Sequence, residues 1–425
     1  MTPTPDATPL LLPEGTRLVH IGPPKTGTTS LQRAFHAGRE AVARQGVHYT
    51  GPTHQPVSPV LAVTGRSNPV VGNPPSLWTW RLLVREVKRA REPRVLVSSE
   101  FFADARPDAI RKIVTDLDPA RVHVAVTLRP LAKILPSQWQ QFVQAGLRES
   151  YDQWLEAMLK PPAGAPTPTF WVRHRHDQLV ARWAEVVGPQ NVTVIALDDR
   201  DQPMVLRVFE RLLGLRDGTL AVEPDLTNRS MTLPEIEVVR AFNASFKAEG
   251  LATPLHTKVM RYGAAAYMKT RVPEPDEPRI ETPGWALERA AAIAREMVDA
   301  IAASGVRVVG DLEGLTQMPV AGPEAARPPE ADRPPEVVVT PRIAASAAMG
   351  VLLASGLARG GTTGVPSATD APDEFAPDHD GYVARPSVEP LALVRLPTLQ
   401  VAGVLLRRTQ SAVGARLHPI LRRIR

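Results

Sequence analysis

Residues 22–30 read GPPKTGTTS and directly follow the short apolar run at 17–22, which reads RLVHIG. The run is typical of a buried strand, and helical periodicity begins within the loop. A loop between a strand and a helix presents backbone N–H groups at the helix N-terminus, where the partial positive charge favours phosphate-like anions. The stretch therefore predicts the start of an α/β fold, with an anion site where the first strand ends.

The same alternation of strands and helices continues along the chain. Further strand-like runs lie at 95–99, 121–128, 192–197 and 306–309. The helical stretches lie at 78–91, 108–118, 131–144, 204–213 and 282–305. Strands separated by helices favour a parallel sheet covered on both faces. We predict one α/β domain over residues 17–320 with a central parallel sheet of about five strands, and a loop rich in proline and glycine over 51–75.

Composition excludes several classes of protein. The chain of 425 residues is 43% hydrophobic and 22% charged, as expected for a globular protein. Cysteine is absent, which excludes disulfides, thiolate metal sites and a cysteine nucleophile. The net charge of +6 arises from residues 391–425, which carry seven Arg and no acidic residue. The remaining chain is nearly neutral, so we expect no nucleic-acid partner.

The ends of the chain differ from the predicted domain. We expect residues 1–16 to be a flexible N-terminus without a secretory signal, which favours a cytoplasmic location. Eleven prolines between residues 321 and 390 predict a mostly disordered linker, with a weak helix at 343–358. Residues 391–425 predict a basic amphipathic helix, which would contact an anionic membrane surface and make the protein peripheral to the membrane. The alternative is that this segment packs on the domain's own surface or is disordered.

The loop differs from the phosphate loop of nucleotide triphosphatases. Gly22 and Gly27 have the spacing of that motif, G-x-x-x-x-G-K-[ST], but Thr28 stands where the lysine belongs. The lysine is instead Lys25, within the loop, which suits a shorter anion. Residues 24–32, PKTGTTSLQ, resemble the 5′-phosphosulfate loop of P-loop sulfotransferases of the bacterial type. These enzymes use 3′-phosphoadenosine-5′-phosphosulfate (PAPS).

The resemblance implies a P-loop sulfotransferase-like fold, PAPS as co-substrate and no metal. It assigns Lys25 to the phosphosulfate and to catalysis, together with the loop residues Thr26, Gly27, Thr28, Thr29 and Ser30. The family also places an Arg at the end of a later strand and a Ser eight residues on. Here these are Arg129 and Ser137, which would bind the 3′-phosphate, with Pro136 expected to kink the helix between them.

The resemblance also implies a general base near the end of the second strand, and Glu100 stands there. Its neighbours Phe101 and Phe102 would raise the pKa of its carboxyl toward a useful range. The alternative is that Glu100 caps the following helix. His20 lies inside the first strand and is expected to be a buried structural residue.

Other residues leave alternatives open. Asn228–Thr232 (NRSMT) would contact the cofactor or acceptor, or cap a helix. His174-Arg175-His176 is expected to be a solvated helix start rather than a metal site. Trp78 and Trp80 would stack on a sugar or belong to the core.

The acceptor is expected to be a hydroxyl or amine of a carbohydrate, glycolipid or small molecule. A nucleotide kinase or ATPase, and an inactive protein that binds 3′-phosphoadenosine 5′-phosphate (PAP), remain alternatives.

Overall fold

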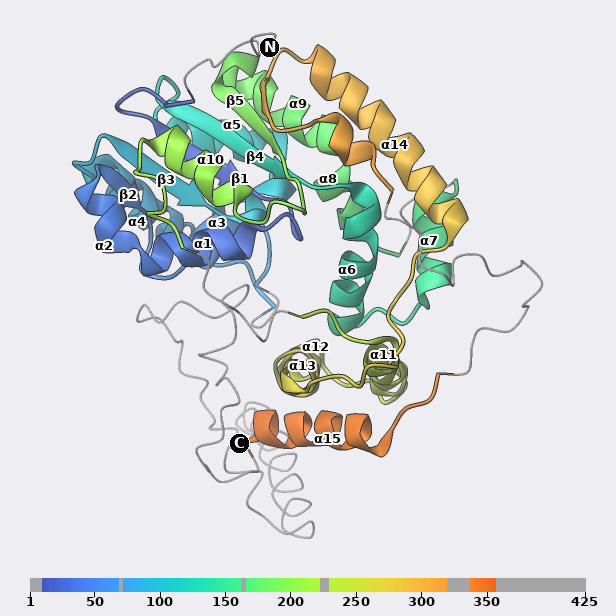
Figure 1. The fold of residues 1–425 in the computed structure, drawn as a ribbon. Helices are drawn as coiled ribbons and strands as arrows, with labels where there is room; N and C mark the ends of the chain where they lie inside the picture. Colours follow the sequence, from blue (N-terminus) through green and yellow to red (C-terminus); the bar gives the residue numbers. More distant parts are fainter. Residues whose placement is uncertain (1–9, 69–71, 162–165, 222–228, 319–336, 357–425) are drawn as a thin grey trace, which may run out of the picture. The chain divides into compact units, whose positions relative to one another are not determined.

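The computed structural model describes residues 10–68, 72–161, 166–221, 229–318 and 337–356. Six parallel strands form one sheet in the order β2-β3-β1-β4-β5-β6 (Figure 1). The strands are β1 (Arg17–Ile21), β2 (Val47–Tyr49), β3 (Arg94–Ser98), β4 (Val122–Leu128), β5 (Val192–Ala196) and β6 (Arg307–Val309). The predicted α/β fold is confirmed. The sheet has one strand more than expected because β2, at the edge, has only three residues and gives no clear pattern in the sequence.

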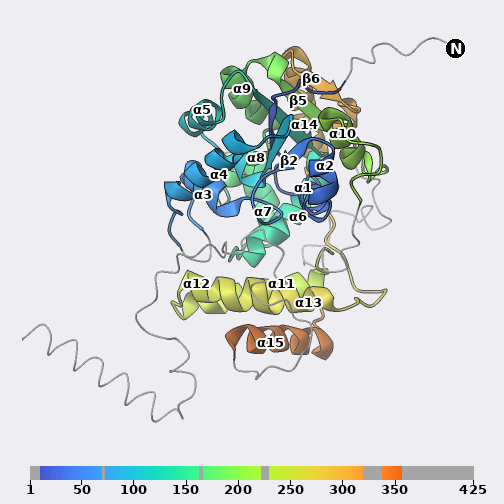
Figure 2. The ribbon, with the colours of Figure 1, turned by 90° about the vertical axis from the view of Figure 1, so that its left-hand side faces the viewer.

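Helices cover both faces of the sheet, as seen with the sheet nearly edge-on in Figure 2. One face carries α3 (Val57–Val63), α4 (Leu77–Arg89), α5 (Pro107–Asp116), α9 (His176–Val187) and the end of α14 (Gly284–Ala303). The other face carries α1 (Thr28–Ala37), α2 (Arg39–Arg44) and α10 (Met204–Leu213). Helix α3 lies within the stretch 51–75 that we expected to be loop.

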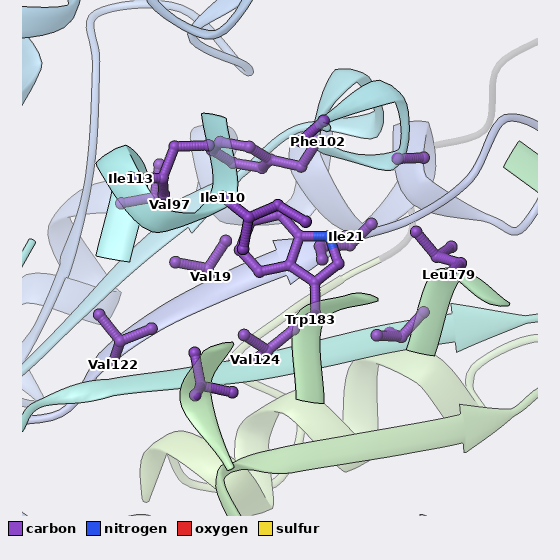
Figure 3. Close-up of a cluster of buried hydrophobic side chains, with 14 of the residues drawn as sticks. Val19, Ile21, Val97, Phe102, Ile110, Ile113, Val122, Val124, Leu179 and Trp183 are labelled. Carbon is purple, nitrogen blue, oxygen red and sulfur yellow. The ribbon is translucent and has the colours of Figure 1, made fainter. Parts of the chain in front are cut away.

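Side chains of successive strand residues alternate between the two faces, as strand geometry requires. Val19 and Val97 belong to the core beneath α3, α4, α5 and α9, whereas Leu18 and Leu96 belong to the opposite core. Trp183 of α9 fills the centre of the first core beside Val124 and Ile110 (Figure 3). These strands are buried on both sides, so their sequences are nearly continuous apolar runs rather than alternating ones.

A third core joins the helices outside the sheet layers. These helices include α6 (Leu131–Gln144), α7 (Tyr151–Leu159), α8 (Thr169–His174), α11 (Leu233–Ala248) and α15 (Pro341–Ser355). A further stretch runs through α12 (Thr253–His256), the π-helical segment Thr257–Ala265 and α13 (Ala266–Thr270). Helices α6 and α15 agree with the helices predicted at 131–144 and 343–358, and α10 agrees with the one predicted at 204–213.

Two segments outside the predicted domain 17–320 also pack against it. Leu12 is buried and its N–H donates to the carbonyl of Leu212 at 2.9 Å, so residues 10–16 are held to the domain. Helix α15 lies within the expected linker 321–390, yet it packs on the π-helical segment. A Cβ atom on Gly350 would lie 2.5 Å from the carbonyl oxygen of Gly263, so only glycine permits this close approach.

Residues 391–425, for which we predict a membrane-binding helix, lie outside the described residues. No helix in the described part of the chain is long and apolar enough to span a bilayer. The membrane contact stays a prediction. We expect that deleting residues 391–425 lowers co-sedimentation with anionic liposomes but not with neutral ones, because each basic residue near an anionic surface contributes about 1 kcal/mol. Equal binding of the full and shortened chains would contradict it.

Candidate functional site

Three neighbouring strands bring the predicted site residues to one edge of the sheet. Strand β1 lies between β3 and β4, and all three run parallel, so their carboxyl ends lie side by side. Strand β1 leads into the loop 22–27, β3 leads to Glu100, and β4 leads to Arg129. The chain order also reverses between β1 and β4, which is where ligands bind in open α/β sheets.

The loop geometry leaves donors for an anion. Helix α1 begins at Thr28, and no side chain caps its N-terminus at Gly27. The N–H groups of its first turn therefore have no partner within the helix. Lys25 and Gly27 adopt the left-handed backbone region, with φ of 73° and 76°. This conformation suits glycine but is strained at Lys25.

Tight packing inside the loop explains Gly22. A Cβ atom at this residue would lie 1.8 Å from the Oγ1 atom of Thr28, so any side chain here would displace the first turn of α1. Lys25 itself is half-buried, while Gly27 is exposed. A phosphate-like group can come within hydrogen-bond distance of backbone N–H groups only where no side chain stands in its way.

The loop hydroxyls divide into two groups. Thr26 is buried, and both its N–H and its hydroxyl donate to the carbonyl of Pro23, at 3.3 and 2.7 Å. Thr28 is also buried, with its Oγ1 atom 3.4 Å from that of Thr26. Thr29 is half-buried and Ser30 is exposed. Thr26 therefore shapes the loop, and Thr29 and Ser30 have the more accessible hydroxyls.

A buried polar network holds the three strand ends together. His20 of β1 lies 2.7 Å from the hydroxyl of Ser98 in β3 and 3.3 Å from that of Thr127 in β4. Thr127 lies 3.0 Å from the hydroxyl of Thr26, and Gln32 of α1 donates to Ser98 at 3.1 Å. Burial lowers the pKa of His20 to about 3, so its ring is neutral at ordinary pH. The expected structural role of His20 agrees with these contacts.

Arg129 links the loop to the strand on its other side. Its Nε donates to Asp199 Oδ1 at 2.8 Å, and its Nη1 reaches the carbonyl of Lys25 at 3.5 Å. Ser137 is half-buried on α6, which continues through Pro136 as one helix. Arg129 thus lies beside the loop, with Ser137 two turns further along the chain.

Glu100 lies at the end of the strand on the opposite side of β1. It is the first residue of the 3₁₀ turn Glu100–Asp104 and is 5% exposed. The turn is capped by Ser99, whose Oγ accepts the N–H of Phe101 at 3.3 Å. Phe101 and Phe102 belong to the sheet core, and Glu100 is the buried residue directly before them.

Several other predictions are settled by burial. His174 and His176 are 0% and 2% exposed, so the expected solvated helix start is wrong. The ring of His174 lies 4.8 Å from that of Phe170, and the backbone N–H of His176 donates to Met297 Sδ at 3.1 Å. Trp80 is fully buried and donates to Asp116 at 2.7 Å, whereas Trp78 is half exposed.

The described part of the segment 228–232 leads into a helix. Thr232 directly precedes α11, and its N–H donates to Glu235 at 2.9 Å. The guanidinium group of Arg229 forms two hydrogen bonds with Glu235, at 2.8 and 2.7 Å, and donates to the carbonyl of Met268. The helix-capping alternative is confirmed for Thr232. Contact of this segment with the cofactor or acceptor stays a prediction, and Asn228 lies outside the described residues.

Sequence reasoning missed two charged residues near Arg129. Lys133 lies in the first turn of α6, and Asp199 follows β5; their Nζ and Oδ2 atoms are 2.7 Å apart. Burial raises the pKa of Asp199, but hydrogen bonds from Lys133 and Arg129 outweigh this and hold it below its usual value. Lysine is rare in this chain, because only eight of the fifty basic residues are lysine, so Lys133 beside Arg129 could have been noticed in the sequence. No comparable feature of the sequence points to Asp199.

Within the described residues, no group of three or more His, Asp and Glu side chains is arranged to hold a metal ion. No protein-family model and no curated protein matches the sequence. Among solved structures, a sulfotransferase from Alicyclobacillus acidocaldarius is similar, with 18% identity and a TM-score of 0.36. The match covers 58% of this chain and 96% of the other. The functional proposal below therefore stands on the residues of this chain.

Proposed function

We propose that the chain is a sulfotransferase that moves a sulfuryl group from PAPS to a hydroxyl or amine of its acceptor. One observation carries the proposal. The uncapped start of α1 with Lys25 lies between Arg129 on one neighbouring strand and Glu100 on the other. These groups follow three adjacent strand ends. The anion site suits the phosphosulfate, the guanidinium group of Arg129 suits the 3′-phosphate, and the carboxylate of Glu100 suits the acceptor proton.

Each residue then has a defined task. The N–H groups at the start of α1 and the ammonium group of Lys25 stabilise negative charge on the transferred group and on the leaving phosphate. Arg129 and Ser137 hold the 3′-phosphate. Glu100 accepts the proton of the acceptor while the sulfur–oxygen bond to the acceptor forms and the sulfur–oxygen bond to the nucleotide breaks. PAP is released as the second product.

The acceptor is proposed to be a carbohydrate, a lipid or a small molecule. Glu100 requires the acceptor on the β3 side of the loop, near the segment Gly51–Trp80. Trp78 is half exposed and its ring lies 4.8 Å from the guanidinium carbon of Arg85, so one aromatic face remains near the surface of this segment. Trp80 is part of the core and takes no part in this proposal.

PAP is expected to raise the melting temperature, because a ligand that binds only the folded state stabilises it by mass action. Lys25→Ala and Arg129→Ala should each reduce this shift. Lys112→Ala is the matched control, because Lys112 pairs with Asp116 on the surface of α5. Thermal unfolding with and without PAP measures the shift, and an unchanged shift in both site variants would refute the assignment.

Calorimetric titration with PAP and ATP, each with and without Mg²⁺, separates the alternatives. A sulfotransferase is expected to bind PAP without Mg²⁺. A kinase or ATPase of the P-loop type would bind ATP more tightly with Mg²⁺, and Thr28 in place of the motif lysine argues against it. PAP binding without turnover on any acceptor would instead indicate an inactive PAP-binding protein.

A further inference from the structure

Lys133 lies between the two residues proposed to bind the 3′-phosphate. Helix α6 begins at Leu131 after Pro130, so Lys133 and Ser137 lie within the helix and Arg129 precedes it. Four residues advance the helix by about 6 Å and return nearly to the same face. Lys133 and Ser137 therefore share one face of α6, and Asp199 joins Lys133 to Arg129.

One carboxylate currently holds both cations. Asp199 accepts Arg129 Nε on Oδ1 at 2.8 Å, and its Oδ2 atom lies 2.7 Å from Lys133 Nζ. All three side chains are about one quarter to one third exposed, so this group is open to a ligand. Its net charge is +1, less than a phosphate monoester dianion requires. The ammonium group of Lys133 has three donors, and one contact with Asp199 leaves the others available.

We propose that Lys133 is a third ligand of the 3′-phosphate and makes the site selective for 3′-phosphorylated nucleotides. The proposal rests on the proposed function, which places the nucleotide across Arg129 and Ser137. Asp199 holds the two cations beside each other before the nucleotide arrives, and it offsets their mutual repulsion. Bound phosphate then shares Lys133 and Arg129 with Asp199.

Calorimetry with PAP and with 5′-AMP, which lacks the 3′-phosphate, tests this role. Lys133→Met is expected to weaken PAP binding about 10-fold, the effect of one lost hydrogen bond to a charged group. Binding of 5′-AMP should stay unchanged. Lys112→Met, on the surface of α5, is the matched control and should alter neither affinity. Equal weakening of PAP and 5′-AMP, or no weakening of either, would overturn the proposal.

A second pair of variants separates direct contact from neutralisation of Asp199. In Lys133→Met the freed carboxylate repels the phosphate, so the same substitution is repeated in an Asp199→Asn background. We expect PAP binding to weaken there as well. If it does not, Lys133 only neutralises Asp199 and is no ligand. A wild-type chain that binds neither nucleotide would contradict the proposed function itself, which keeps the two failures distinct.

Discussion

Replacing Glu100 with Gln is expected to lower turnover by roughly 10²–10⁴-fold, the usual contribution of a general base. Glutamine has nearly the same shape but cannot take the acceptor proton. PAP binding should remain close to wild type, because Glu100 follows β3, whereas Arg129 and Lys133 lie beyond β4 on the other side of β1. The measurement is PAP release with an acceptor on which the wild type turns over.

Glu210→Gln supplies a matched control for this substitution. Glu210 is also buried, and its Oε1 atom accepts the N–H of Leu220 at 2.7 Å, a contact that glutamine retains. Its helix, α10, carries none of the proposed site residues. Wild-type turnover in Glu100→Gln would show that Glu100 only starts its 3₁₀ turn. His20 would not replace it as base, because its ring is buried and bonded within the strand network.

Three buried histidines are together expected to lower the free energy of unfolding by about 6 kcal/mol between pH 7 and pH 5. Burial lowers the pKa of His20 to about 3 and those of His123 and His176 to about 4. An unfolded histidine titrates near its model value of 6.5, so the unfolded state binds protons that the native state excludes. Each group then costs about 2 kcal/mol at pH 5. His174, whose pKa burial also lowers, adds to the loss.

The loss of stability on acidification is specific to these buried histidine rings. A native pKa below the unfolded value means that stability is complete above pH 6.5 and is lost as pH falls toward the native pKa. The pKa of His48 is raised by its hydrogen bond to Glu86, so this residue acts in the opposite direction. Carboxylates with lowered pKa values, such as Glu277 at about 2, lose their contribution only below about pH 4.5.

Urea unfolding at pH 7, 6 and 5 measures this loss. His174→Leu is a sensitive comparison, because neither nitrogen of this fully buried ring has a hydrogen-bond partner. We expect the variant to be more stable by about 1–3 kcal/mol at pH 7, since an unsatisfied buried polar group is removed. Its loss on acidification should also be smaller than that of the wild type. A wild-type stability that does not change over this range would contradict the prediction.

Local patterns in the sequence predicted most of the central strands and the helices between them. Buried runs such as 121–128 identified central strands, because strands covered on both faces need continuous apolar residues. The motif at 22–30 identified the loop, because a close approach to a helix N-terminus requires glycine at Gly22 and donors after it. The sequence did not predict edge strand β2 or helix α3. Three strand residues are too few to show a hydrophobic period, and the proline-rich stretch around α3 shows none.

The sequence by itself determined which residue types follow the ends of the strands: Lys25 in its loop, Glu100, and Arg129, with Ser137 eight residues further along the chain. Only the tertiary structure decided that β3, β1 and β4 are neighbours, because strand order depends on long-range packing that no local period encodes. It likewise decided the burial of His174 and His176, and the pairing of Asp199 with Arg129 and Lys133. Asp199 is 70 residues from Arg129 in the chain, and the pairing of β4 with β5 brings their carboxyl ends together.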